Sequence, residues 1–110
     1  MALLSAQYRR RLLENGLDRE KDHIPVVKLF TPWANATWVL KDMEPDGDTC
    51  FGLCDLGLGE PELGYVSLTE LESLRGPAGL KVEVDLHWEP TKPLSAYTSA
   101  ARANRRYVEP

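Results

Sequence analysis

The chain has 110 residues, of which 43% are hydrophobic and 27% are charged, and its formal net charge at pH 7 is −4. These values are typical of one soluble globular domain that folds alone, and a domain of this size leaves little room for a deep cofactor cavity. The sequence contains neither a membrane-length apolar run nor a secretory leader pattern, so we expect a cytoplasmic protein without membrane association.

The first predicted element is an amphipathic helix over about residues 5–15. Ser5 is a typical N-cap, and Gly16 offers a stop at the C-terminal end. Three apolar residues recur at helical spacing and predict the face that packs on the rest of the domain: Leu4, Tyr8 and Leu12. The basic run at residues 9–11 then lies mostly on the outer side of the helix, as a solvated face.

Four segments rich in β-branched and aromatic residues follow, bounded by Pro, Gly, Asn and Asp turns: residues 26–31, 36–42, 49–56 and 63–67. The first two of these segments predict a hairpin. Ser67 and Glu70 have the spacing of a capping box, which predicts a short helix after the fourth strand. Gly76 and Pro77 are expected to end that helix.

The clearest alternation in the chain covers residues 81–88 and predicts a fifth strand. Its buried face is expected to hold Val82, Val84, Leu86 and Trp88. Its solvated face is expected to hold Glu83, Asp85 and His87. Residues 96–110 contain alanines but few large apolar side chains, so we expect a loose C-terminal helix or a basic tail beyond a domain of residues 1–95.

The order of these elements predicts an α+β fold. Strands follow one another along the chain, with helices set at the ends rather than alternating as in βαβ units. We therefore expect an antiparallel sheet of four to five strands with the N-terminal helix packed on it. Trp38 and Trp88 fit strand faces and are expected in the core, whereas Trp33 follows Pro32 in a connecting loop.

Charge is unevenly distributed along the chain. The net charge is +2 for residues 1–21, −8 for residues 22–92 and +2 for residues 93–110. A nucleic-acid-binding domain normally carries a net basic footprint, so the acidic middle argues against nucleic-acid binding by the folded body. The same charge would steer the protein toward a basic partner.

The two cysteines are expected to be free thiols. Cys50 and Cys54 lie in one predicted strand, where residues four apart are separated by about 13 Å and cannot form a disulfide. With His23 and His87 they lack the close-paired spacing of a structural zinc site. We therefore expect no metal and no cofactor.

Several motifs together resemble one bacterial family. They are LFTP (Leu29 to Pro32), DTCFGL (Asp48 to Leu53), ELGYVSLTEL (Glu62 to Leu71) and EVDLHWEP (Glu83 to Pro90). In this combination they are similar to the family called domain of unknown function 2958, over about residues 3–95. The resemblance implies a protein carried on plasmids, phages or integrated mobile elements, often near genes that defeat host restriction. It implies no established activity and supplies no catalytic residues.

One row of polar residues is a candidate for catalysis or metal binding. Glu83, Asp85 and His87 could supply an acid, a base or ligands for a divalent cation, joined by Asp46 and Asp48 from a loop. Successive residues on one strand face lie about 7 Å apart, which is too wide for all three to bind one ion without loop partners. A solvated sheet face is the alternative interpretation.

Two kinds of contact residue are candidates for protein binding. Trp33 is an aromatic side chain in a loop, either an exposed contact residue or a residue folded back on the sheet. Four acidic residues lie in predicted turns: Asp46, Asp48, Glu60 and Glu62. The leading hypothesis is a non-catalytic, anti-defence binding protein, of anti-restriction or anti-CRISPR type. Its acidic surface would engage a basic surface of a host nucleic-acid-handling protein. The alternatives are a small metal-dependent hydrolase using residues 83, 85 and 87, and a weak nucleic-acid binder working through its Arg-bearing ends.

Overall fold

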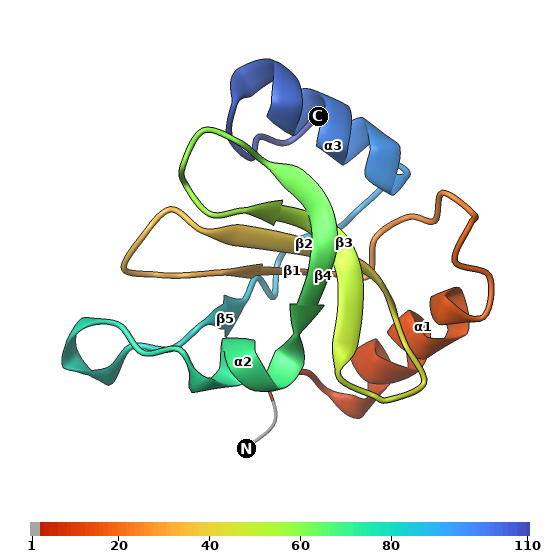
Figure 1. The fold of residues 1–110 in the computed structure, drawn as a ribbon, viewed down its shortest axis with the longest axis horizontal. Helices are drawn as coiled ribbons and strands as arrows, with labels where there is room; N and C mark the ends of the chain where they lie inside the picture. Colours follow the sequence, from red (N-terminus) through yellow and green to blue (C-terminus); the bar gives the residue numbers. More distant parts are fainter. Residues whose placement is uncertain (1–2) are drawn as a thin grey trace.

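In the computed structural model, which describes residues 3–110, five antiparallel strands form one sheet in the order β4-β3-β2-β1-β5 (Figure 1). The strands are β1 (Val27–Phe30), β2 (Thr37–Met43), β3 (Thr49–Asp55), β4 (Glu62–Ser67) and β5 (Glu83–Val84). Three α-helices accompany them: α1 (Ala6–Gly16), α2 (Leu68–Ser73) and α3 (Leu94–Asn104). The predicted α+β fold with an antiparallel sheet is confirmed.

The helix α1 covers one face of the sheet at β2. Ser5 caps it, because its Oγ accepts a hydrogen bond of 3.2 Å from the backbone N–H of Tyr8. Leu4 and Leu12 are buried, and Tyr8 packs half-buried against the same cluster. The side-chain amide of Asn15 donates to the carbonyl oxygen of Lys41 at 2.9 Å. The helix therefore packs through the predicted face and is fastened to β2 at its C-terminal end.

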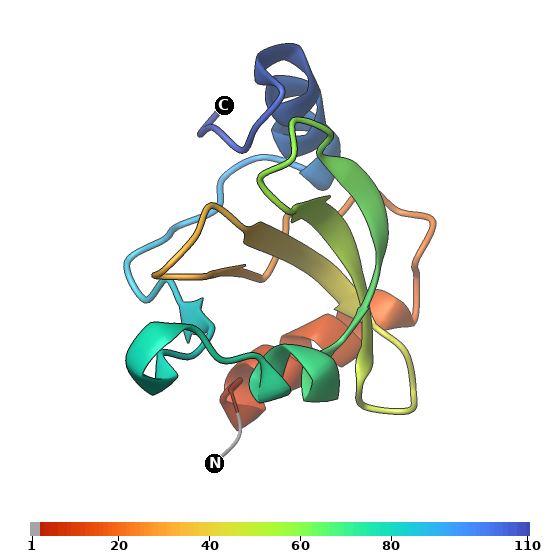
Figure 2. The same ribbon diagram turned by 60° about the vertical axis from the view of Figure 1, so that its left-hand side comes forward.

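The two faces of the sheet contact different helices. The cross-strand neighbours Leu29, Trp38 and Cys54 lie on the face that packs with α1. Val39 and Leu53 lie on the opposite face and pack against α3. Figures 1 and 2 both show α1 and α3 on opposite sides of the strands. The sheet is the middle layer between two hydrophobic clusters.

The C-terminal segment is a packed helix. α3 runs across residue 95, after which we expected a loose helix or a basic tail. It is anchored by four buried side chains: Leu94, Tyr97, Thr98 and Ala101. Pro93 supplies no side-chain cap at its start. Instead, the carboxylate of Asp22 accepts a hydrogen bond of 3.0 Å from the backbone N–H of Ser95. The helix is thus ordered by contacts with distant parts of the chain.

The short helix α2 begins as predicted. Its N-cap Ser67 accepts a hydrogen bond of 3.3 Å from the backbone N–H of Glu70, and its buried residues are Leu68 and Leu71. A 3₁₀ turn follows at Pro77–Gly79. Within residues 3–110, no helix combines the length and the apolar character that crossing a membrane requires.

The predicted strand over residues 81–88 is confirmed only at Glu83–Val84, which pairs with Leu29 and Phe30 of β1. The backbone N–H of Asp85 still donates to the carbonyl oxygen of Lys28 at 2.9 Å, and the pairing ends there. The side chain of Asp85 then accepts a hydrogen bond of 3.2 Å from the backbone N–H of His87, and the chain turns. Leu86, expected in the core, is 76% exposed because this turn carries it away from the sheet.

The glycines of β3 and β4 give a stability prediction. Gly52 and Gly64 are direct cross-strand neighbours. A Cβ at Gly52 would lie 2.0 Å from the carbonyl oxygen of Val39, whereas a Cβ at Gly64 would meet no atom within 4 Å. We expect Gly52→Ala to lower the free energy of unfolding by roughly 3 kcal/mol or more, and Gly64→Ala to change it by less than about 1 kcal/mol. Urea denaturation measures both, and equal stability of the two variants would contradict the close approach of β2 and β3.

Candidate protein-binding surface

The acidic turn between β2 and β3 holds two of the predicted contact residues, Asp46 and Asp48. The carboxylate of Asp46 accepts hydrogen bonds from the backbone N–H groups of Asp48 (2.8 Å) and Thr49 (2.9 Å). The carboxylate of Asp48 accepts from the hydroxyl of Ser67 (2.6 Å) and the backbone N–H of Thr69 (2.8 Å). These hydrogen bonds lower the pKa of both carboxyls. The largest effect comes from the Thr49 backbone N–H for Asp46 and from the Ser67 hydroxyl for Asp48. Both side chains therefore hold the turn and the start of α2.

The other two acidic candidates, Glu60 and Glu62, lie beside exposed apolar side chains. Both are exposed, and neither forms an ion pair within residues 3–110. Four neighbours on the β3–β4 turn and on β4 are also exposed: Leu56 (57%), Leu58 (80%), Leu63 (40%) and Tyr65 (62%). We call these six residues the β4 edge surface. Exposed apolar side chains with a charged rim make this surface a candidate for protein interaction.

These six residues line one hollow of about 370 Å³. Trp38 and Cys54, which lie next to each other on β2 and β3, are also part of its lining. Gly64 contributes no side chain to it, and the space above its Cα is open. The hollow is therefore an apolar recess at the edge of the sheet, rimmed by the carboxylates of Glu60 and Glu62.

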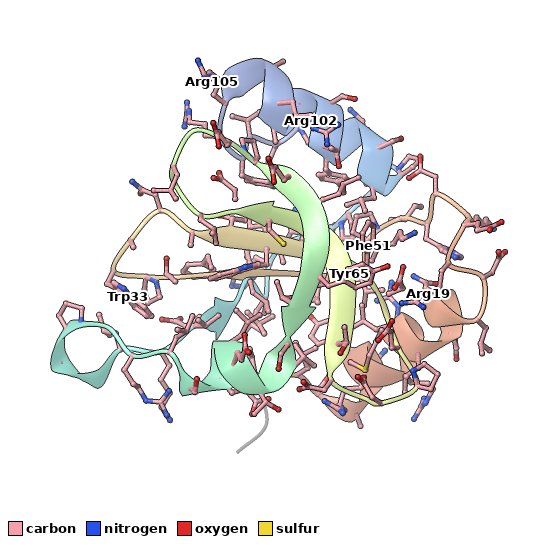
Figure 3. The ribbon with its side chains drawn as sticks, in the orientation of Figure 1. Arg19, Trp33, Phe51, Tyr65, Arg102 and Arg105 are labelled. Carbon is pink, nitrogen blue, oxygen red and sulfur yellow. The ribbon has the colours of Figure 1, made fainter. Side chains whose placement is uncertain are left out.

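Tyr65 is held in place on the opposite face of β4. Its ring packs against Phe51 with the ring centroids 5.0 Å apart, and the guanidinium carbon of Arg19 lies 5.9 Å from the Tyr65 centroid (Figure 3). Arg19 is itself bound to Glu44 at 2.7 Å. An aromatic side chain already ordered in the free protein loses little entropy when a partner covers it.

Trp33 is half-buried in the loop between β1 and β2, packed against the main hydrophobic cluster. A Cβ at Gly76 would lie 2.2 Å from its Cδ2 atom, so the indole ring rests directly on the backbone that follows α2. Figure 3 shows Trp33 at the end of the molecule that carries the β1–β2 loop. Of the two interpretations of this loop residue, the structure has the one in which the side chain folds back on the domain. A role in partner binding stays a prediction.

The polar residues Glu83, Asp85 and His87 do not form a shared site among the described residues. None of these three side chains hydrogen-bonds another, and Asp85 instead pairs with the ammonium group of Lys28 at 3.2 Å. Residues 3–110 contain no group of three or more His, Cys, Asp or Glu side chains that could hold a metal ion. Trp88, expected in the core, is half-buried, with its ring 5.6 Å from that of Tyr97.

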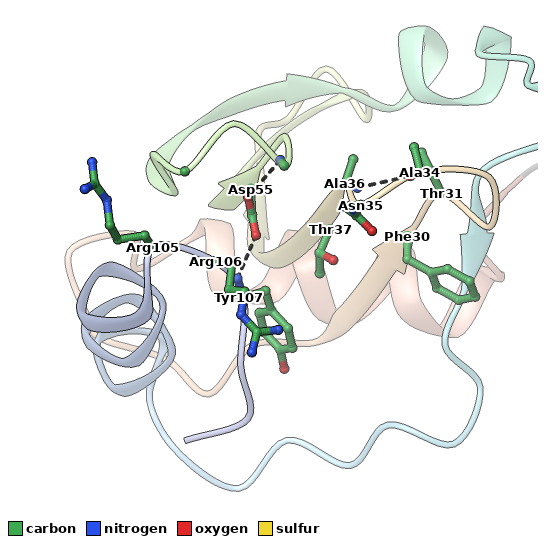
Figure 4. Close-up of a pocket in the computed structure, with 12 residues that line it drawn as sticks. Phe30, Thr31, Ala34, Asn35, Ala36, Thr37, Asp55, Arg105, Arg106 and Tyr107 are labelled. Carbon is green, nitrogen blue, oxygen red and sulfur yellow. Dashed lines mark hydrogen bonds between the residues drawn. The ribbon is translucent and has the colours of Figure 1, made fainter.

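A larger hollow, of about 590 Å³, lies between the β1–β2 loop, the end of β3 and the C-terminal segment (Figure 4). Its buried acid, Asp55, accepts hydrogen bonds from the backbone N–H groups of Gly57 (2.9 Å) and Tyr107 (2.6 Å). The side chain of Arg105 points away from the other lining residues. The carboxylate is thus occupied in holding the C-terminal segment against the sheet, which is a structural role.

Cys50 and Cys54 are free thiols on β3, as predicted. Cys50 is buried and Cys54 is half-buried. Burial raises the pKa of Cys50 to about 12 and that of Cys54 to about 11. Both thiols are therefore protonated at neutral pH and are poor nucleophiles.

The fold and this surface define a small α+β protein with exposed apolar side chains at the β4 edge of its sheet. The family model described as "Protein of unknown function (DUF2958)" matches residues 3–108, so the chain belongs to the DUF2958 family. No curated protein and no solved structure matches the chain.

The apolar members of the β4 edge surface were not among the predicted contact residues. Leu56 and Leu58 alternate with Gly57 and Gly59, which both adopt positive φ angles. Leucines spaced between turn glycines cannot all face a core, because such a turn lies on the protein surface. That pattern is the signal by which the sequence could have revealed them.

The hydrogen bonds of Asp48 predict a pH-dependent contribution to stability. A lowered pKa means that this contribution is present above the unfolded value of 3.8 and is lost as the pH falls through the folded value. We expect Asp48→Asn to be less stable than wild type at pH 7, with a gap that narrows toward acid pH. Urea midpoints from neutral to acid pH measure this, with Asp18→Asn as the control because the exposed Asp18 carboxylate accepts no hydrogen bond within residues 3–110. A gap independent of pH would contradict the assigned role.

The raised thiol pKa values predict slow modification of the folded protein. At pH 8 we expect a disulfide reagent to react with Cys54 about 100-fold more slowly in the folded chain than in urea, because far less thiolate is present. Cys50 should react more slowly still, since it is also buried. Absorbance of the released thiolate follows both reactions, and equal rates in folded and unfolded protein would show that burial does not suppress ionisation.

Proposed function

We propose that this chain is a non-catalytic binding protein that engages a basic surface of another protein through the β4 edge surface. The observation that carries this proposal is the row of exposed apolar side chains along β4 and the turn before it, together with two carboxylates that form no ion pair within residues 3–110. The apolar side chains supply area to be buried, and the carboxylates supply the preference for basic groups.

The charge of the chain supports this choice of partner. Residues 22–92, which include the whole β4 edge surface, carry a net charge of −8. Such a field raises the rate of encounter with a basic protein and repels the phosphates of nucleic acids. Arg102 lies on α3, and Arg105 is the C-cap of that helix, next to the β3–β4 turn, whose Gly57 and Gly59 line the larger hollow with it (Figure 3).

We further propose that the protein acts in the cytoplasm as an anti-defence inhibitor, of anti-restriction or anti-CRISPR type. Family membership supports this step, since the resemblance described above implies carriage on plasmids, phages or integrated mobile elements near genes that defeat restriction. The partner in that setting is a host nucleic-acid-handling protein, whose surface is basic because it binds phosphates. An acidic protein with a hydrophobic recess suits such a target.

Charge reversal tests the proposal. We expect Glu60→Lys/Glu62→Lys to slow association with the host partner about tenfold and to reduce its salt dependence. The matched control is Glu20→Lys/Glu89→Lys, which changes the net charge equally at two other exposed positions. Capture from nuclease-treated host lysate, followed by binding kinetics at several salt concentrations with the recovered protein, measures the effect.

Two results would contradict the proposal. The first is equal recovery of every captured protein by the Glu60/Glu62 variant and by wild type. The second is capture that disappears when the lysate is treated with nuclease, since the partner would then be a nucleic acid. Loss of biological effect in Glu83→Ala/Asp85→Ala/His87→Ala, with folding and binding intact, would instead favour the hydrolase alternative.

A further inference from the structure

We infer that β4 accepts an extended segment of the partner as an additional β-strand. An aliphatic side chain of that segment lies in the recess beside Gly64, and its Lys or Arg side chains lie near Glu60 and Glu62. This inference rests on the proposed function and specifies the mode of binding at the same surface.

The two edges of the sheet differ in how they are protected. β5 is only two residues long, whereas β4 has six residues and carries exposed apolar side chains. Natural proteins shield edge strands with lysines, prolines, bulges or short length. Within Glu62–Ser67 there is no Lys or Pro, and the register between β3 and β4 runs without a bulge. This edge is therefore open to strand pairing.

The pattern of hydrogen bonds shows which backbone groups are available. The backbone N–H of Leu68 donates to the carbonyl oxygen of Asp48 at 3.0 Å. Antiparallel ladders alternate, so Gly64 bonds to β3 while Leu63 and Tyr65 direct their N–H and C=O groups away from it. An incoming strand would pair with those groups on Leu63 and Tyr65.

The recess lies where such a strand would place a side chain. Residues 62, 64 and 66 share the face of β4 that carries Trp38 and Cys54 on the neighbouring strands. The residue opposite Gly64 on the added strand would direct its side chain toward this face. Because Gly64 has no side chain and opens on empty space, an aliphatic group fits there. Strand addition combines backbone hydrogen bonds with such side-chain pockets.

Charge distinguishes the partner segment from a second copy of this chain. Pairing β4 with β4 of another copy would bring the acidic residues Glu60 and Glu62 of both copies to one interface. Like charges across paired strands are destabilising, whereas Lys or Arg on the incoming strand would complement them. The occupant is thus an extended basic segment with at least one aliphatic residue.

A displayed library of random linear dodecapeptides, panned on the full chain, tests the inference. We expect enriched peptides with an aliphatic residue flanked by Lys or Arg. Their synthetic copies should bind Gly64→Val about tenfold or more weakly, because the added side chain fills the recess. The control Ser99→Val, at an exposed position of α3, should bind like wild type. Amide hydrogen exchange of Leu63 and Tyr65 should slow when the peptide is bound.

The possible failures are distinguishable. Peptides that require Glu60 and Glu62 but bind Gly64→Val normally and leave the two amides unprotected would overturn strand addition while leaving the proposed function standing. Failure to enrich any peptide that depends on Glu60 and Glu62 would overturn both. A dimer seen by sedimentation and lost in Gly64→Val would show that a second copy is the occupant, which also overturns the inference.

Discussion

The structure depends on a bulge in the central strand β2. The register between β2 and β3 shifts between Leu40 and Asp42, and the charged neighbours Lys41 and Asp42 at this bulge are both buried. Both faces of the sheet are covered here, so neither side chain reaches solvent. The Lys41 ammonium lies 3.3 Å from the Asp42 carboxylate and donates to the carbonyl oxygens of Arg19 (2.7 Å) and Lys21 (3.2 Å). Because buried charges are tolerated only when they are paired and hydrogen-bonded, this pair holds the loop after α1 against β2.

That loop in turn positions the C-terminal helix. The carbonyl oxygen of His23 accepts a hydrogen bond of 3.0 Å from the backbone N–H of Leu94, next to the bond between Asp22 and Ser95. Both bonds satisfy N–H groups at the start of α3, which have no partners inside the helix. The buried charge pair, the loop and α3 therefore form one connected support for the second face of the sheet.

Local pattern was enough to predict much of the fold. The spacing of Leu4, Tyr8 and Leu12 gave the packed face of α1, and the Ser67 cap gave the start of α2. Prediction failed where a distant residue decides the outcome. The order of α3 depends on Asp22. The chain leaves β1 at Asp85, whose backbone and side chain both bind the distant Lys28, and Leu86 lies exposed in the turn that follows. Neither dependence is visible in a local window.

The candidate surface shows the same division between local and distant information. The acidic character of the turns could be read directly, and Glu60 and Glu62 do lie exposed at a recess. The structural roles of Asp46 and Asp48 could not be read in the same way. Asp48 binds Ser67 and Thr69 because the pairing of β3 with β4 brings these distant residues together. Of four acids that look equivalent in sequence, two support the fold and two remain available to a partner.

Gly52 and Gly64 lie inside the paired strands β3 and β4. Glycine inside a strand weakens it and marks a bend or the close approach of another backbone. Gly52 is explained within the chain, because the Val39 carbonyl occupies the space where a Cβ would lie. Gly64 has no such neighbour among the described residues. A side chain there would meet no atom of the isolated domain within 4 Å and would cover the recess, so this glycine keeps open the place where we propose that a partner strand binds.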